Sequence, residues 1–171
     1  MSGPDHGQLM AAARELGDSL RDRRLRLATA ESSTGGLIGH AITSAPGASD
    51  FYAGGVICYS NRAKEVGLGV SHELIVEHGA VSAEVASAMA VAAAHRFEAE
   101  VGVSVTGIAG PDGGSERKPV GTHFIGVSLR GYPPAVARHI FGHDREGNQA
   151  EAALVALGQA RDAVLAATEN G

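Results

Sequence analysis

Apolar residues recur every three or four positions in several segments, which is the spacing that places them on one face of an α-helix. The pattern is clearest where Val85 and Met89 follow Ser82, a residue type that commonly caps a helix N-terminus. The same criteria predict helices over 9–24, 33–43, 61–66, 71–79 and 146–168. Ser33 or Thr34 is the expected cap of the second helix in the chain.

Short apolar runs between these helices predict strands. The run 101–106 is rich in β-branched residues and is typical of a strand buried on both faces. Further strands are expected over 26–30, 51–59, 120–129 and 135–141, the last two as an antiparallel hairpin. Because helices and strands intermix, the chain is predicted to be an α/β protein, a three-layer α/β/α sandwich with a mixed, mostly parallel sheet. One domain is expected over 1–171.

Composition and charge narrow the class of protein. The net charge of -5 and the lack of a long basic run argue against binding to nucleic acid. No apolar run approaches the ~20 residues that span a bilayer, and no leader segment is evident, so a soluble cytoplasmic protein is expected. The single cysteine, Cys58, cannot form an intramolecular disulfide, and no Cys/His spacing indicates a metal site.

The segment 30–39, with the sequence AESSTGGLIG, holds the candidate nucleophile. It connects a predicted strand to a predicted helix, so Ser32 lies where free helix N–H groups meet a ligand. A serine hydroxyl needs a base and an oxyanion site, and amides near 34–36 are the expected oxyanion donors. The alternative interpretation is that the serines only cap the helix that follows.

Lys64 is the candidate base, because none of the eight histidines lies in a sequence context that indicates a catalytic role. Tyr59 ends a predicted strand and Lys64 follows one turn later, so both are expected at the same sheet edge as Ser32. Only a neutral lysine accepts a proton, and burial or a nearby cation must therefore lower its pKa. Tyr59 could instead relay the proton through a hydrogen bond to Lys64, and a solvated Lys64 without a role is the alternative to both.

The glycine-rich loop over 107–118 is a candidate for binding phosphate through its backbone N–H groups. It matches neither the P-loop nor the dinucleotide-binding fingerprint. Ser115 and Lys118 satisfy the S-x-x-K spacing, but that motif requires a helix start, which this loop excludes. Arg145 precedes the last predicted helix and could bind an anion or form a surface pair with Asp144.

Five motifs in this order resemble the CinA C-terminal domain family, over about residues 8 to 168. They are 30–36, 59–64, 106–114, 118–121 and 144–145. The family is known for nicotinamide mononucleotide amidohydrolases, which convert the carboxamide to the acid and ammonia. The resemblance therefore implies a small nucleotide substrate, no cofactor and no metal, no nucleic-acid or membrane partner, and a homodimer.

By position, Ser32 matches the family's nucleophile, and Tyr59 and Lys64 match the residues thought to activate it. The implied substrate-binding residues are Thr34, Gly35, Gly36, Asn61, Thr106, Gly107, Gly110 and Arg145. One departure from the family pattern is Ser33, where many members carry cysteine. Two other functions stay open at this point: a catalytically silent nucleotide- or partner-binding domain, and an amidase for another small amide.

Overall fold

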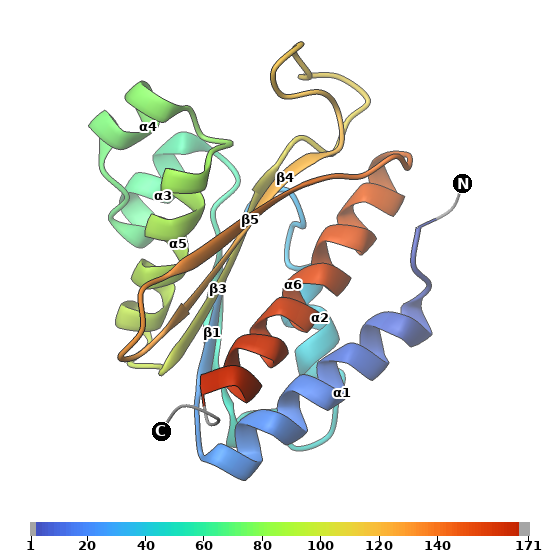
Figure 1. Ribbon diagram of the computed structural model, residues 1–171, viewed down its shortest axis with the longest axis vertical. Coiled ribbons are helices and arrows are strands. Elements are labelled where there is room, and N and C mark those ends of the chain that lie inside the picture. Colours follow the sequence, from blue (N-terminus) through green and yellow to red (C-terminus); the bar gives the residue numbers. More distant parts are fainter. Residues whose placement is uncertain (1–2, 168–171) are drawn as a thin grey trace.

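A five-stranded mixed sheet forms the centre of the computed structural model, which describes residues 3–167 (Figure 1). The strands are β1 (Leu27–Glu31), β2 (Tyr52–Ile57), β3 (Val101–Gly107), β4 (Thr122–Leu129) and β5 (Ala135–Ile140), in the order β2-β1-β3-β4-β5. β1 is parallel to β2 and β3, whereas β4 is antiparallel to β3 and β5. Every strand except β4 therefore runs in one direction, which confirms the mixed, mostly parallel sheet and the hairpin.

Helices cover both faces of this sheet. They are α1 (His6–Arg23), α2 (Leu37–Thr43), α3 (Asn61–Leu68), α4 (His72–His78), α5 (Ala83–Arg96) and α6 (Arg145–Ala167), with a 3-10 turn, η1 (Ala48–Asp50). Figure 1 shows α3, α4 and α5 on one face and α1, α2 and α6 on the other. The three-layer α/β/α prediction is confirmed, although residue 168 of the predicted last helix lies outside the described residues.

Small side chains allow the layers to approach closely. Val101, Val103 and Val105 of β3 are buried, as expected for a strand covered on both faces. A Cβ atom on Gly102 would lie 2.0 Å from the Ala90 carbonyl oxygen of α5, so only glycine fits between the strand and this helix. The layers therefore pack closely although the chain has few aromatic side chains.

The start of α2 differs from the prediction. Its N-cap is Gly36, with φ of 101°, and no side chain of the cap residue bonds to the helix. Glycine tolerates this left-handed conformation, which other residues adopt rarely. The prediction that Ser33 or Thr34 caps this helix is therefore wrong, because the turn continues to residue 36 before the helix begins.

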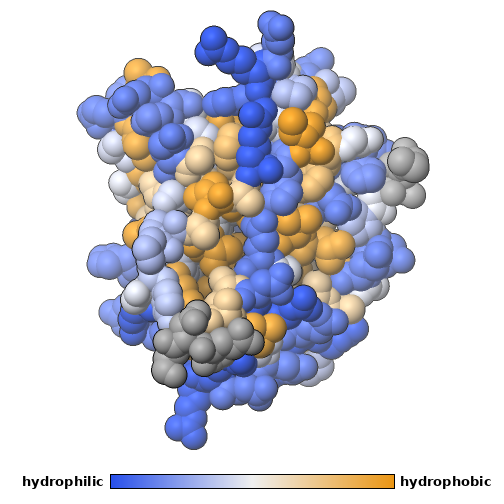
Figure 2. Space-filling view, in the orientation of Figure 1, coloured by the Kyte–Doolittle hydropathy of each residue, from blue (hydrophilic) through white to orange (hydrophobic). Residues whose placement is uncertain are grey.

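A shallow apolar groove of about 200 Å³ lies between β4 and α6 and includes Val127, Leu129 and Ala163. Figure 2 shows hydrophobic surface on this face of the molecule, with hydrophilic residues around it. Leu129 pairs with Val101, the first residue of β3, whereas the candidate nucleophile follows the last residue of β1. The groove is therefore at the opposite end of the sheet from the predicted site.

The carboxyl ends of the three parallel strands meet at one edge, where ligand sites of open α/β sheets form. Backbone pairing continues past the strands here, since the Ser32 N–H donates to Val105 O at 2.9 Å. On the other side of β1, the Cys58 N–H donates to Glu31 O at 2.8 Å. These two bonds fix the backbone that follows β1 and β2.

Candidate active site

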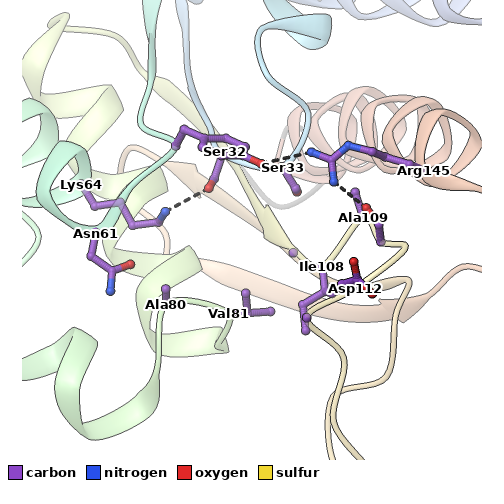
Figure 3. Close-up of a pocket in the computed structure, with 14 residues that line it drawn as sticks. Ser32, Ser33, Asn61, Lys64, Ala80, Val81, Ile108, Ala109, Asp112 and Arg145 are labelled. Atoms are coloured by element: carbon purple, nitrogen blue, oxygen red, sulfur yellow. Dashed lines mark hydrogen bonds between the residues drawn. The ribbon is translucent and has the colours of Figure 1, made fainter.

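Ser32 and Lys64 form a buried pair at this edge. The Lys64 Nζ atom lies 2.9 Å from the Ser32 Oγ atom, and the two residues are 1% and 7% exposed, respectively. The dashed line in Figure 3 marks this contact. In the charged state the ammonium donates to the hydroxyl; in the neutral state the hydroxyl can donate to the amine. The structure thus confirms that the predicted nucleophile and base meet.

The start of α3 determines where the lysine side chain points. The Ser60 hydroxyl accepts the Ala63 N–H at 3.0 Å and so caps the helix. Lys64 follows one turn into α3, and its side chain reaches back so that Nζ also donates to Cys58 O at 3.0 Å. The amine is therefore held between the end of β2 and the nucleophile.

Burial sets the electrostatics of this pair. Removal of Lys64 from water disfavours the ammonium and lowers its pKa below the ordinary 10.5, while the Cys58 thiol acts weakly in the other direction. Among the described residues no carboxylate lies within ion-pair distance of Lys64 to offset that cost. A neutral lysine is what a proton acceptor requires, so the environment favours the state that can act as a base.

Tyr59 contacts a different partner from the one predicted. Its hydroxyl accepts from Nη2 of Arg145 at 3.0 Å, and the side chain is 63% exposed. The other guanidinium nitrogen, Nη1, donates to Gly110 O at 2.5 Å. The alternative in which Tyr59 is hydrogen-bonded to Lys64 is not seen in the structure, because the Tyr59 hydroxyl contacts Arg145 and the Lys64 amine contacts Ser32.

A cavity of about 300 Å³ opens over the pair. The lining comes from five parts of the chain. They are the turn after β1 (Ser32, Ser33), the segment after β2 with the start of α3 (Tyr59, Asn61, Lys64), the segment before α5 (Ala80, Val81), the end of β3 with the loop that follows it (107–110, 112, 113), and Arg145. In Figure 3 Lys64 and Arg145 approach the two serines from opposite sides, with Ile108 and Val81 across the opening. This volume is at the small end of the range for sites that take a small molecule.

The N-terminus of α2 does not face this cavity. The Glu31 carboxylate, 2% exposed, accepts the N–H groups of Gly36 at 3.1 Å, Ile38 at 3.1 Å and Gly39 at 2.8 Å. The expectation that free helix amides meet the ligand is therefore wrong, since a carboxylate of the chain itself already occupies them. Within the described residues, the N–H groups of Ser33 and Thr34 have no hydrogen-bond acceptor, and these are the amides next to the nucleophile.

Of the predicted substrate-binding residues, Asn61, Gly107, Gly110 and Arg145 line the cavity. The other four, which are Thr34, Gly35, Gly36 and Thr106, lie outside its lining. The Thr34 hydroxyl donates to Glu31 at 2.7 Å, and the Thr106 hydroxyl donates to Ala80 O at 2.8 Å. Both threonine hydroxyl groups therefore hold backbone segments near the site and are not available to a ligand.

Two residues of α6 hold the walls of the site and were not predicted. Asn148, which is fully buried, donates from Nδ2 to Ala109 O at 3.0 Å. Gln149 donates from Nε2 to Ser33 O at 2.8 Å. Their positions three and four residues after Arg145 place all three on one side of the first helical turn. That spacing is the only signal in the sequence, and it does not identify partners so distant along the chain.

Two kinds of feature are absent from the described residues, 3–167. No three His, Cys, Asp or Glu side chains there come together in a way that could hold a metal ion. None of the helices in that range has the length and apolar composition of a membrane span.

The fold and the site together define a class: an α/β protein with a buried serine–lysine pair at the carboxyl edge of its parallel strands. The CinA C-terminal domain model matches residues 9–164, and the chain therefore belongs to the CinA family. Among solved structures, it is similar to competence/damage inducible protein CihA from Agrobacterium tumefaciens. That match has a TM-score of 0.89 and 34% identity, and covers 96% of this chain and 99% of the other.

Curated relatives are similar over the same region. A CinA-like protein from Salinibacter ruber is 49% identical over 146 residues, which covers 85% of this chain and 35% of the relative. A CinA-like protein from Mycobacterium avium is 56% identical over 113 residues, covering 66% of this chain and 26% of the relative. The chain thus spans about a third or less of the length of these curated relatives.

Proposed function

We propose that this protein is an amidohydrolase that converts the carboxamide of nicotinamide mononucleotide to the carboxylate and releases ammonia. The observation that carries this proposal is the buried contact of 2.9 Å between Ser32 Oγ and Lys64 Nζ inside a cavity of small-molecule size. Membership of the CinA family supports the choice of substrate, through the family's known amidohydrolase members.

The proposed reaction is acyl transfer in two halves. Neutral Lys64 takes the proton of the Ser32 hydroxyl as Oγ attacks the amide carbon. The carbon–nitrogen bond then breaks, and Lys64 returns the proton to the departing ammonia, which leaves an ester on Ser32. Water attacks the ester, gives one proton to Lys64, and the acid is released as Ser32 recovers its proton.

The amides of Ser33 and Thr34 are the proposed oxyanion donors, since they follow the nucleophile and have no acceptor among the described residues. One good donor contributes roughly 3 to 4 kcal/mol to the transition state. Arg145 is proposed to bind the phosphate, because it is the cation besides Lys64 among the described residues that line the cavity. Its hydrogen bonds to Tyr59 and Gly110 O hold the guanidinium in place for that contact.

The test is ammonia release by the purified protein from the mononucleotide, the dinucleotide and free nicotinamide. Ser32→Ala is expected to lower turnover of the mononucleotide by at least about 1,000-fold, because the nucleophile is removed. Ser33→Ala is the matched control, since it shortens the neighbouring serine but keeps its backbone N–H, and it is expected to lose far less. Binding of the mononucleotide without ammonia release from any of the three compounds would contradict the proposal and favour a silent binding domain.

A further inference from the structure

Glu31 and Ser32 are neighbours in the chain but face opposite sides of the sheet. Successive side chains in a strand alternate between faces. The Ser32 side chain accordingly meets Lys64 of α3, whereas the Glu31 side chain meets the start of α2. The residue that precedes the nucleophile is therefore held on the face of the sheet that α2 covers, opposite to Lys64.

The anchor consists of four hydrogen bonds to one buried carboxylate. Oε2 accepts from the Thr34 hydroxyl at 2.7 Å and from the N–H groups of Gly36 and Ile38, both at 3.1 Å. Oε1 accepts from the Gly39 N–H at 2.8 Å. Because donors at residues 34 and 36 belong to the same turn as the nucleophile, the carboxylate fixes that turn at both ends.

This arrangement decides which amides are available to a ligand. The Leu37 N–H bonds to Thr34 O and the His40 N–H bonds to Gly36 O, so the remaining first-turn amides of α2 also have partners. Without Glu31, the Ile38 N–H would be buried and unpaired, the Gly36 and Gly39 N–H groups would lose their acceptor, and the turn could relax to satisfy them. Such a movement would shift the two amides that follow Ser32.

We propose that Glu31 is a positioning residue for the reaction, because it holds the turn 32–36 and thereby the orientation of the Ser33 and Thr34 N–H groups, the proposed oxyanion donors. The inference rests on the proposed amidohydrolase function. Glu31 acts through the backbone and touches neither substrate nor Lys64. Loss of Glu31 should therefore weaken the stabilisation of the transition state, where the oxyanion forms. It should change the affinity for the intact amide only slightly.

Glu31→Gln is the decisive variant. It keeps the size of the side chain but turns one acceptor into an NH₂ group that faces N–H donors. The matched control is Glu100→Gln at the other end of β1, where Glu100 accepts the Arg26 N–H at 2.8 Å and pairs with Arg130. Both changes remove a carboxylate that holds backbone, but only Glu31 adjoins the site.

The measurements are kcat for ammonia release from nicotinamide mononucleotide and the Kd of the mononucleotide, taken by calorimetry in a Ser32→Ala background. Glu31→Gln is expected to lower kcat about 100-fold, as small displacements of reacting groups do, with little change in Kd. Thr34→Val, which removes one of the four donors, is expected to lower kcat about tenfold. Glu100→Gln should keep the wild-type kcat.

A Glu31→Gln protein with wild-type kcat, or one that loses affinity and kcat by the same factor, would overturn the inference. Should Glu31→Gln fail to fold, Thr34→Val decides, and a wild-type kcat in that variant overturns the inference as well. A wild-type chain that releases no ammonia overturns the proposed function and this inference with it. An active wild type with an equally active Glu31→Gln overturns the inference alone.

Discussion

The Lys64 amine is buried with two hydrogen-bonding oxygens and, among the described residues, no countercharge. Desolvation under these conditions penalises the protonated form, so the neutral amine is available at a lower pH than for a lysine in water. The chemistry of the site should therefore depend on pH through this one group.

We expect kcat to rise with pH and to reach a plateau, with a midpoint below the ordinary lysine pKa of 10.5. The sign follows from the role of Lys64, because only its deprotonated form accepts the Ser32 proton and deprotonation increases with pH. Lys64→Arg keeps a cation but cannot give up its proton, so it should be inactive at every pH. A pH-independent kcat in the wild type, or activity in Lys64→Arg, would contradict this role.

Tyr59 is expected to act on binding and not on proton transfer, since its hydroxyl meets Arg145. Tyr59→Phe should raise KM for the mononucleotide several-fold, as the loss of one hydrogen bond to a charged group predicts, and leave the pH midpoint of kcat unchanged. Steady-state kinetics across pH provides the measurement. A shifted midpoint with an unchanged KM would instead support the proton relay.

At the scale of elements, the first turn of α6 connects two walls of the cavity. Arg145 and Asn148 hold the carbonyl groups of Gly110 and Ala109, and Gln149 holds that of Ser33. The Ser33 carbonyl and the Thr34 N–H belong to one planar peptide group and point in opposite directions. A side chain that fixes the carbonyl therefore also fixes the orientation of the N–H.

Gln149→Leu is consequently expected to lower kcat about tenfold, with a small change in Tm, because Gln149 is only partly buried and one neutral hydrogen bond is lost. Gln159→Leu is the control on the same helix, since its amide contacts His139 and no residue of the cavity. Equal kcat values for the two variants would show that the Ser33 peptide does not need this support.

At the scale of the whole molecule, stability should decrease in acid because of His123. Its ring is fully buried in β4, Nδ1 donates to Gly121 O at 2.9 Å, and Nε2 has no partner among the described residues. Burial lowers its pKa below the ordinary 6.5, and the nearby His139 acts in the same direction. Protonation of Nε2 in the folded state would place an unpaired charge in the core.

The free energy of unfolding should therefore be constant above about pH 6.5 with respect to this group, and should fall as pH drops toward the lowered pKa of the native state. The sign holds because the unfolded chain binds the proton more readily than the folded one. Denaturant unfolding between pH 7 and 5 measures the slope, which His123→Gln should reduce. His95→Gln, at an exposed position, should leave the slope unchanged.

Much of this fold could be predicted because the apolar spacing reflects local rules. The helix caps Ser71 and Ser82 and the buried strand β3 all occur where the pattern indicates. The meeting of Ser32 with Lys64 was also predictable, since parallel strands bring their carboxyl ends to one edge. These features depend on a few neighbouring residues or on the topology of the sheet.

Other features could not be predicted from local sequence. The first N–H groups of α2 are accepted by Glu31 in the preceding strand, so a search for a serine or threonine at the helix start finds the wrong residue. Gln149 reaches Ser33 across 116 positions, and no spacing encodes such a contact. Tyr59 is predicted as the last residue of a strand but lies two residues after β2, and its hydroxyl contacts Arg145, from the far end of the chain.

The burial of Ser32 limits which amides can reach its hydroxyl. Ser32 is 7% exposed, so we expect its hydroxyl to react best with a carbonyl carried at the end of a compact molecule. An amide in the middle of a polypeptide would have to bring chain in from both sides, which a cavity of about 300 Å³ disfavours. Under the proposed amidohydrolase function, we therefore expect the protein to leave peptide bonds of folded proteins uncut, because access to Ser32 selects against them.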